Sequence, residues 1–306
     1  MASTAWQSTQ GNTRWRFKSS LLPYLLITPT IIFVALFTAW PTILAIYQSL
    51  FRQRLNIARF RDPTFVGLDN YIDLFSDDRF IKVLLNTATF VLTSVPASVA
   101  LGLLFALLIN RKLRGIGLLR LAFFYPTVLP MVSAATIWLF FFTPDYGIFN
   151  TSLNFVGYSG PENWTANPHL ALFAIVIVSI WKNAGFYMIF YLAGMQSLPS
   201  DVYEAATLDG ANWWQLLTRI TLPLLRRTTL FITTIAVISA FQTIDHIFVL
   251  TGGGPSRAST VLLFELYQRR FENFDVGISA TITVILIAAL LIFTVSNFLM
   301  SERRGA

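Results

Sequence analysis

Six long apolar runs constrain this 306-residue chain more than any other feature. The runs cover residues 21–50, 83–110, 118–143, 170–197, 225–250 and 277–300. Each reaches the ~20 residues that an α-helix needs to cross ~30 Å of hydrocarbon. Lipid offers no hydrogen bonds to free backbone groups, and the alternating pattern of a membrane β-barrel is missing, so the runs predict helices. Charged residues make up only 12% of the chain, about half the share typical of a soluble protein.

The predicted fold is therefore an all-α integral membrane protein with six transmembrane helices. A polar tail over residues 1–20 precedes one transmembrane domain over residues 21–306, and the polar segment 200–223 lies between the fourth and fifth runs. Prolines are expected to kink the first and third helices. These prolines are Pro29, Pro41, Pro126 and Pro130.

Lys and Arg residues predict the orientation of the chain. With a cytoplasmic N-terminus, twelve of them lie on the inner side and nine on the outer side. The loop 144–169 has no Lys or Arg and agrees with this orientation, whereas the basic loop 51–82 opposes it. An even number of helices then places both termini in the cytoplasm.

Composition excludes several kinds of site. The chain has no cysteine, so it has no disulfide, thiolate nucleophile or cysteine metal site. Its two histidines, His169 and His246, lie in separate segments, so no metal site is expected, and His246 is predicted to lie at the membrane interface. The net charge of +7 fits cationic loops beside anionic lipid, and nucleic acid is not an expected partner.

The segment 200–223 predicts two short helices joined by a tight turn. Ser200 is a candidate N-cap, and Asp201 places a negative charge in the first turn, where the helix dipole favours it. Gly210 can adopt the left-handed conformation that ends the first helix. A second helix is expected from Ala211, and Pro223 marks its end. Its apolar face would consist of Trp213, Leu216, Leu217 and Ile220.

On its physical chemistry alone, this hairpin could equally be an amphipathic loop resting on the membrane surface. Its spacing carries further information. Glu204-Ala205-Ala206, Gly210 and the sequence ITLP at 220–223 resemble the EAA motif of ABC importer permeases, position for position. Two more segments resemble signatures of the maltose and glycerol-3-phosphate branch of type I ABC importers, VGLDNYIDLF at 66–75 and DHIFVLTGGGPSRAST at 245–260.

This resemblance implies a permease subunit with no catalytic residues and no cofactor of its own. The implied partners are a second homologous permease, two cytoplasmic ATPase subunits that bind ATP and Mg²⁺, an external solute-binding protein and the lipid bilayer. The implied location is the inner or plasma membrane of a prokaryote. The implied solute is a carbohydrate or a molecule like glycerol-3-phosphate. The residues implied to couple to the ATPase are Glu204, Ala205, Ala206, Asp209, Gly210 and Ala211.

Four polar or aromatic residues are candidates for the substrate path. Trp181 could stack on a sugar ring, and Lys182 or Asn183 could hydrogen-bond it. A charge inside the membrane calls for a partner or a wet cavity, so Asp245 near the external end of the fifth run is the fourth candidate. The alternative is a structural Lys182 that pairs with Asp245 between neighbouring helices.

The triple glycine Gly252-Gly253-Gly254 invites comparison with phosphate-binding loops. It lacks the lysine and the strand-loop-helix context of such loops, so a tight external turn ended by Pro255 is predicted instead. Within the resemblance, Gly252, Gly253, Gly254 and Pro255 could also contact the solute receptor.

Two other classes of membrane protein remain as alternatives. An ion-coupled secondary transporter of a small polar solute would need intramembrane carboxylates and often has inverted repeats, for which Asp245 alone is thin support. A membrane-embedded enzyme would need a nucleophile, a metal or paired carboxylates, and the sequence shows no such grouping near the runs.

Overall fold

A computed structural model describes residues 16–110, 115–157 and 162–302, and this part of the chain is almost entirely helical. Most of the predicted tail, residues 1–15, lies outside the described residues, as do the basic residues at 111–114. The first helix begins at Arg16, earlier than expected, because no proline or glycine precedes Pro23 in this stretch to prevent a helix.

The elements up to residue 157 form the first half of the described fold. They are α1 (Arg16–Val34), the π-turn η2 (Ala35–Ala39), α2 (Trp40–Ser49), β1 (Phe51–Arg52), the 3-10 turn η3 (Ala58–Phe60), β2 (Thr64–Phe65), α3 (Asp69–Ser76), α4 (Asp78–Ile109), α5 (Ile116–Val128), α6 (Met131–Phe141) and α7 (Ile148–Phe155). The two strands pair in antiparallel register, Phe51 opposite Phe65 and Arg52 opposite Thr64.

The elements of the second half begin with a central helix of 26 residues. They are α8 (Ala171–Gln196), α9 (Ser200–Leu208), α10 (Trp213–Gln215), the π-turn η4 (Leu216–Thr221), α11 (Leu222–Leu224), α12 (Arg226–Phe241), α13 (Asp245–Leu250), α14 (Leu262–Tyr267), the π-turn η5 (Gln268–Glu272) and α15 (Val276–Glu302).

Four helical stretches of the described chain are long and apolar enough to cross a membrane. They are Pro23–Ser49, Asp78–Ile109, Ala171–Gln196 and Val276–Leu299. Two further spans are bent pairs, Ile116–Val128 with Met131–Phe141 at 103° and Trp213–Leu224 with Arg226–Phe241 at 65°. Six spans result when each bent pair counts once, so the predicted all-α fold is confirmed, with two of its six helices broken.

The third span is broken where a kink was predicted. Pro130 begins α6 as its N-cap, and Leu129 before it is extended at φ −64° and ψ 138°. A proline disfavours the helical conformation of the residue before it, which explains why α5 stops here. Pro126 lies within the last turn of α5 and does not interrupt it.

The fifth span is shorter than the predicted run 225–250. Helix α12 ends at Phe241, and a new helix, α13, begins at Asp245. The polar residues Gln242, Thr243 and Asp245 interrupt the apolar run at this point. Short polar side chains compete with the helical backbone for hydrogen bonds and favour helix ends. The run 225–250 was defined by its overall apolar content, so these polar residues were overlooked.

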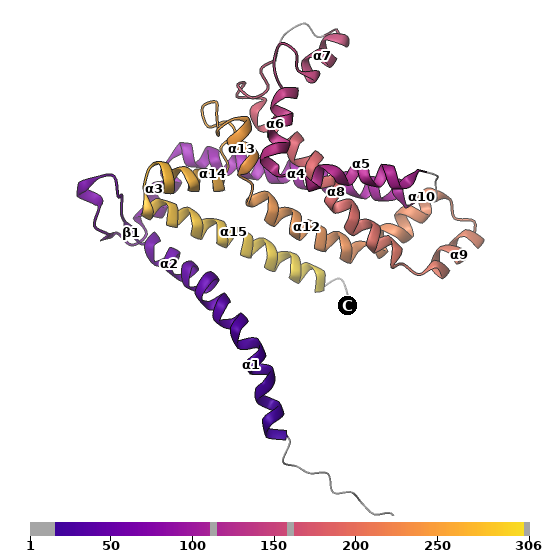
Figure 1. Ribbon diagram of the computed structural model, residues 1–306, viewed down its shortest axis with the longest axis horizontal. Helices are drawn as coiled ribbons and strands as arrows, with labels where there is room; N and C mark the ends of the chain where they lie inside the picture. The colour runs from indigo at the N-terminus through magenta and orange to yellow at the C-terminus, as the bar shows by residue number, and fades with distance from the viewer. Residues whose placement is uncertain (1–15, 111–114, 158–161, 303–306) are drawn as a thin grey trace, which may run out of the picture.

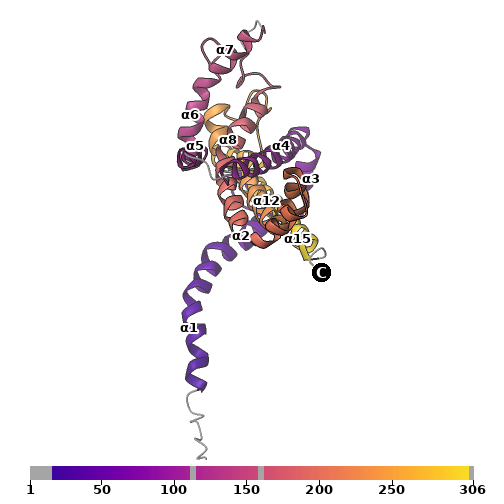
Figure 2. The ribbon, with the colours of Figure 1, turned by 90° about the vertical axis from the view of Figure 1, so that its right-hand side faces the viewer.

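The first part of the first span, α1, lies apart from the other helices, whereas α2 packs against α15 (Figure 1). The π-turn η2 ends at Ala39, two residues before Pro41, which lacks an N–H group and cannot continue the regular helical ladder, whereas Pro29 remains inside α1. Both ribbon views show α1 projecting away from the bundle (Figures 1 and 2). Apolar side chains from Tyr24 to Tyr47 are exposed along it, so this helix needs lipid or another chain around it.

The core forms around the crossing of α4 and α8, with α12 and α13 packed against them. Fully buried residues from these helices meet here, among them Phe90, Ile175, Met188, Ile232 and Ile247. Helices α9 and α10 lie at one end of the bundle, and β1, α3 and α14 lie at the other (Figure 1). The polar segment 200–223 and the segment 66–75 therefore lie on opposite sides of the core, as the predicted topology requires.

Candidate functional site

The first helix of the coupling segment begins one residue earlier than predicted. Pro199 occupies the N-cap position in an extended conformation, and Ser200 is already helical. The Ser200 hydroxyl donates to the Asp201 carboxylate at 3.3 Å and caps no backbone N–H. Asp201 does lie in the first turn, where its charge complements the helix dipole.

Gly210 ends this helix in the predicted left-handed conformation, with φ +79°. Its N–H donates to the Thr207 carbonyl at 3.1 Å, and the Ala211 N–H donates to the Ala206 carbonyl at 2.9 Å. These two bonds form a Schellman motif, which satisfies the last carbonyl groups of α9. No atom of the described chain lies within 4 Å of the place where a side chain on Gly210 would begin.

The second helix begins at Trp213 instead of Ala211. Asn212 and Gln215 form a reciprocal capping box, with 2.9 Å from the Gln215 N–H to Asn212 Oδ1 and 2.8 Å from the Asn212 N–H to Gln215 Oε1. The sequence carried this signal, an Asn followed three residues later by Gln, and the sequence analysis missed it. After Gln215 the chain continues as the π-turn η4, so the predicted α-helical face from Trp213 to Ile220 is not regular.

The hairpin presents its turn to solvent. Glu204, Ala205, Asp209 and Gly210 are exposed, and Ala206 and Ala211 are half-buried. Leu208, which the sequence analysis did not single out, is 89% exposed beside them.

The base of the hairpin is attached to the membrane helices. Tyr203 Oη lies 3.0 Å from Thr221 Oγ1, which links α9 to η4. A pocket of about 510 Å³ lies beneath, lined by Tyr203, Glu204 and Trp213 together with the ends of α4 and α8. A short, hydrogen-bonded connection therefore joins the hairpin to the chain that leads into α12.

The predicted turn at Gly252–Pro255 is confirmed. Gly252 and Gly253 are left-handed at φ 56° and 81°. Ser259 and Thr260 donate from their hydroxyls to the carbonyls of Gly254 at 2.6 Å and Gly253 at 2.8 Å. Gly252 is exposed, Gly253 is buried, and Gly254 and Pro255 are half-buried, so Gly252 is the most accessible of the four to a partner.

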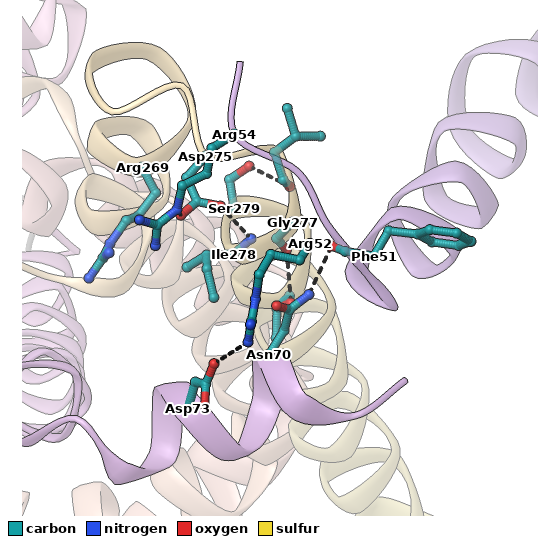
Figure 3. Close-up of polar contacts among 12 residues, drawn as sticks. Phe51, Arg52, Arg54, Asn70, Asp73, Arg269, Asp275, Gly277, Ile278 and Ser279 are labelled. Atoms are coloured by element: carbon teal, nitrogen blue, oxygen red, sulfur yellow. Dashed lines mark hydrogen bonds and ion pairs between the residues drawn. The ribbon is translucent and has the colours of Figure 1, made fainter. Parts of the chain in front are cut away.

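Ion pairs join this side of the molecule across long sequence distances (Figure 3). Arg54 bonds Asp275 at 2.6 Å, although 221 positions separate them, and Arg52 bonds Asp73 at 2.6 Å. The buried Glu265 holds both Arg257 at 2.6 Å and Arg269 at 2.7 Å. The sequence analysis identified none of these pairs. No spacing rule connects Arg54 with Asp275, whereas Glu265 and Arg269 have the i,i+4 spacing of a helical ion pair, which was overlooked.

Asn70, within the segment 66–75, fixes the end of the first span. Its side-chain amide donates to the Ser49 carbonyl at 2.8 Å and the Phe51 carbonyl at 2.9 Å (Figure 3). Asn70, Arg52, Arg54 and Asp73 also line a polar pocket of about 300 Å³. The signature that the sequence shows in this loop therefore has a structural role, joining α3 to the end of α2.

The four candidates for the substrate path do not form one cluster of free side chains. Trp181 packs edge-on against Trp138, with ring centroids 5.5 Å apart. Asn183 donates to the Ser179 carbonyl at 2.9 Å. Asp245 is exposed in the first turn of α13.

The proposed pairing of Lys182 with Asp245 is wrong. Among the described residues no ion pair joins them, and the Lys182 ammonium instead donates to backbone carbonyls at the end of α5. Those carbonyls are free because α5 ends at the break. The sequence does not show that this break lies beside Lys182.

His246, predicted to lie at the membrane interface, lies in the protein interior. Its side chain is buried against Phe90 of α4, with ring centroids 6.1 Å apart. Within residues 16–110, 115–157 and 162–302, no group of three or more His, Asp or Glu side chains is arranged to hold a metal ion.

Comparison with known proteins identifies the family. The family described as the binding-protein-dependent transport system inner membrane component matches residues 79–304. The trehalose/maltose transport system permease protein MalF of Thermococcus litoralis is 35% identical over 92% of this chain and 94% of its own length. The sn-glycerol-3-phosphate transport system permease protein UgpA of Yersinia pestis bv. Antiqua is 33% identical over 94% of this chain and 96% of its own.

Two solved structures agree with this family. One chain of a bacterial ABC transporter involved in the import of the acidic polysaccharide alginate superposes with a TM-score of 0.80 and 25% identity, covering 95% of this chain and 99% of its own. A second structure of an alginate ABC transporter, in complex with a periplasmic protein carrying an alginate pentasaccharide, has a TM-score of 0.80 and 26% identity over 94% of this chain. These matches are to importers and not to ion-coupled secondary transporters. The chain belongs to the binding-protein-dependent transport system inner membrane component family and is a multi-pass membrane permease subunit of an ABC importer.

Proposed function

We propose that this subunit forms a translocation path together with a second, homologous permease. Two cytoplasmic ATPases would bind ATP and Mg²⁺, and an external binding protein would deliver the solute. The exposed apolar surface of α1 supports a partner chain, because little of this helix is covered by the rest of the subunit. The relatives named above are themselves permease components of transport systems.

The coupling hairpin is the observation that carries this proposal. Glu204 to Ala211 would dock in a groove of the ATPase, with Gly210 setting the angle and Leu208 reaching furthest into the groove. The exposed tip and the hydrogen-bonded base support this role, since docking needs an accessible contact and coupling needs a stiff connection. The enzyme activity thus resides on another chain.

The orientation follows from this docking. The end of the bundle with α9 and α10 would face the cytoplasm, and the end with β1, α3 and α14 would face outward, in a prokaryotic inner or plasma membrane. Helix α15 runs from the outer end toward the α9 end, so the C-terminus would be cytoplasmic (Figure 1). Gly252 and its neighbours up to Pro255 would then contact the solute-binding protein.

The solute is proposed to be a carbohydrate or a glycerol-3-phosphate-like molecule. The names of two relatives support these two classes, trehalose/maltose and sn-glycerol-3-phosphate. Trp181 and Asn183 are half-buried near the middle of α8 and would meet the solute from there, whereas Asp245 would meet it near the outer mouth.

Reconstitution tests this function. The subunit would be placed in liposomes with its genomic neighbours, a second permease, an ATPase and a binding protein, and supplied with radiolabelled maltose, trehalose or sn-glycerol-3-phosphate. ATP supplied on the side of the membrane that carries the ATPases should drive uptake of one of these solutes. Omission of the ATPase or of the binding protein should abolish the uptake. Uptake by this chain alone under a sodium or proton gradient would contradict the proposal.

A further inference from the structure

Lys182 lies near the middle of α8 and faces the end of α5. Its Nζ donates to the carbonyls of Pro126 at 3.3 Å, Thr127 at 3.3 Å and Leu129 at 2.5 Å. The ammonium is the ordinary form of a lysine side chain, and in this form it can donate to all three carbonyls. The side chain then places a positive charge inside a membrane-spanning helix.

The three carbonyls are those that the break in the third span leaves free. The last four carbonyls of a helix have no partner within it, and the helix dipole places a partial negative charge there. In water such groups are solvated, but inside a membrane an unpaired carbonyl is costly. Lys182 satisfies three of these groups with one side chain.

Helices α5 and α8 also touch at this level. A Cβ atom on Gly185 would lie 2.1 Å from the Phe123 carbonyl oxygen, so α5 rests directly on the backbone of α8. Thr127 returns a hydrogen bond from its hydroxyl to the Lys182 carbonyl at 3.1 Å. The end of α5 is thus held to α8 by contacts in both directions, and α6 leaves this point at 103°.

We propose that Lys182 is a positioning residue for transport, a built-in cation that caps α5 and holds the angle between α5 and α6. Ion-coupled carriers bind Na⁺ at the C-terminal ends of broken membrane helices, where carbonyl groups converge. In this chain a tethered ammonium takes that place, so the break keeps its geometry with no bound ion. The inference rests on the proposed function, because it assigns Lys182 to the machinery of that importer and removes it from the residues available to the solute.

The angle at the break can be measured directly. The chain has no cysteine, so two introduced cysteines can carry spin labels without background. Leu118 on α5 and Phe140 on α6 are suitable, because they are 74% and 60% exposed and lie on either side of the break. Pulsed electron resonance on the assembled transporter should give a narrow distance distribution for the otherwise unchanged chain and for Lys182→Arg, and a broadened or displaced one for Lys182→Met.

Transport gives the second readout. Lys182→Met should lower ATP-driven uptake by at least about tenfold, the effect of losing a well-placed cation at a helix end. Arg61→Met is the control, because Arg61 also carries a positive charge but is exposed in the loop 51–82, so uptake should stay near the wild-type rate. In Lys182→Ala, added propylammonium should restore uptake and 1-propanol of similar size should not.

A distance distribution in Lys182→Met as narrow and centred as in the unchanged chain would overturn the proposal. Equal restoration by 1-propanol would overturn it too, because the side chain would then act through volume and not through charge. A failure of the proposed function is distinguishable from both outcomes: the unchanged complex would show no ATP-driven uptake, while the spin-label distances would still report on Lys182.

Discussion

The hairpin at 200–223 and the loops at the other end of the bundle differ in the interactions that hold them. The hairpin relies on hydrogen bonds between near neighbours, such as Ala211 to Ala206 and Gln215 to Asn212, and leaves its tip exposed. The loops at the other end add charged pairs between distant segments, such as Arg54 with Asp275. Local bonds shape the turn of the hairpin, whereas the long-range pairs connect segments that lie far apart in the chain.

The largest expected effect is at the tip of the hairpin. Gly210→Asp should reduce ATP-driven uptake to background while the protein still inserts in the membrane, because it adds a side chain and a negative charge at the proposed docking surface. Gly210→Asn is the control, since Asn and Asp both tolerate the left-handed conformation and Asn adds no charge, so it should keep most of the activity. Normal uptake by Gly210→Asp would show that this turn is not the coupling contact.

The next largest effect is on stability at the other end. Glu265 is 0% exposed and joins Arg257 and Arg269, so Glu265→Ala leaves Arg257 without this partner and Arg269 with only Asp77 at 3.9 Å. Because both arginines are partly exposed, the loss should be up to about 3 kcal/mol. Thermal unfolding in detergent measures this loss. An unchanged unfolding temperature would mean that the ion pairs of Glu265 do not hold this end together.

A smaller effect is expected from the cap of the second hairpin helix. Asn212→Ala removes the side chain that accepts from Gln215 and should cost about 1 kcal/mol locally. Hydrogen exchange at the Gln215 amide should accelerate about fivefold, while Asn212→Asp, which keeps an acceptor, should exchange at nearly the original rate. Equal protection in the alanine variant would show that the hairpin does not depend on its local bonds.

The smallest effect is expected at an exposed ion pair of the external loops. Asp73 is 58% exposed on its side chain, so Asp73→Asn should change the free energy of unfolding by less than about 1 kcal/mol, and the difference should shrink in high salt. Both residues are paired carboxylates, and they differ in exposure. The difference between the free energies of unfolding lost in Asp73→Asn and in Glu265→Ala therefore reports the effect of burial. A loss as large as that of Glu265→Ala would show that the exposed pair also holds the loops.

Features set by neighbouring residues were predictable from the sequence. The spans over α4, α8 and α15 follow from apolar length, and the turn at Gly210 follows from a residue type with its own backbone preference. The capping box of Asn212 and Gln215 was equally local and was overlooked. The break at Pro130 was anticipated as a kink, but its angle of 103° was not.

The sequence by itself determined that this chain crosses a membrane, roughly where its spans lie and where the turn at Gly210 falls, because apolar length and glycine act over a few consecutive residues. The tertiary structure alone decided that Lys182 caps α5 instead of pairing with Asp245, and that Arg54 meets Asp275. A charge buried among helices takes whichever partner the packing brings near it, and packing depends on the whole chain.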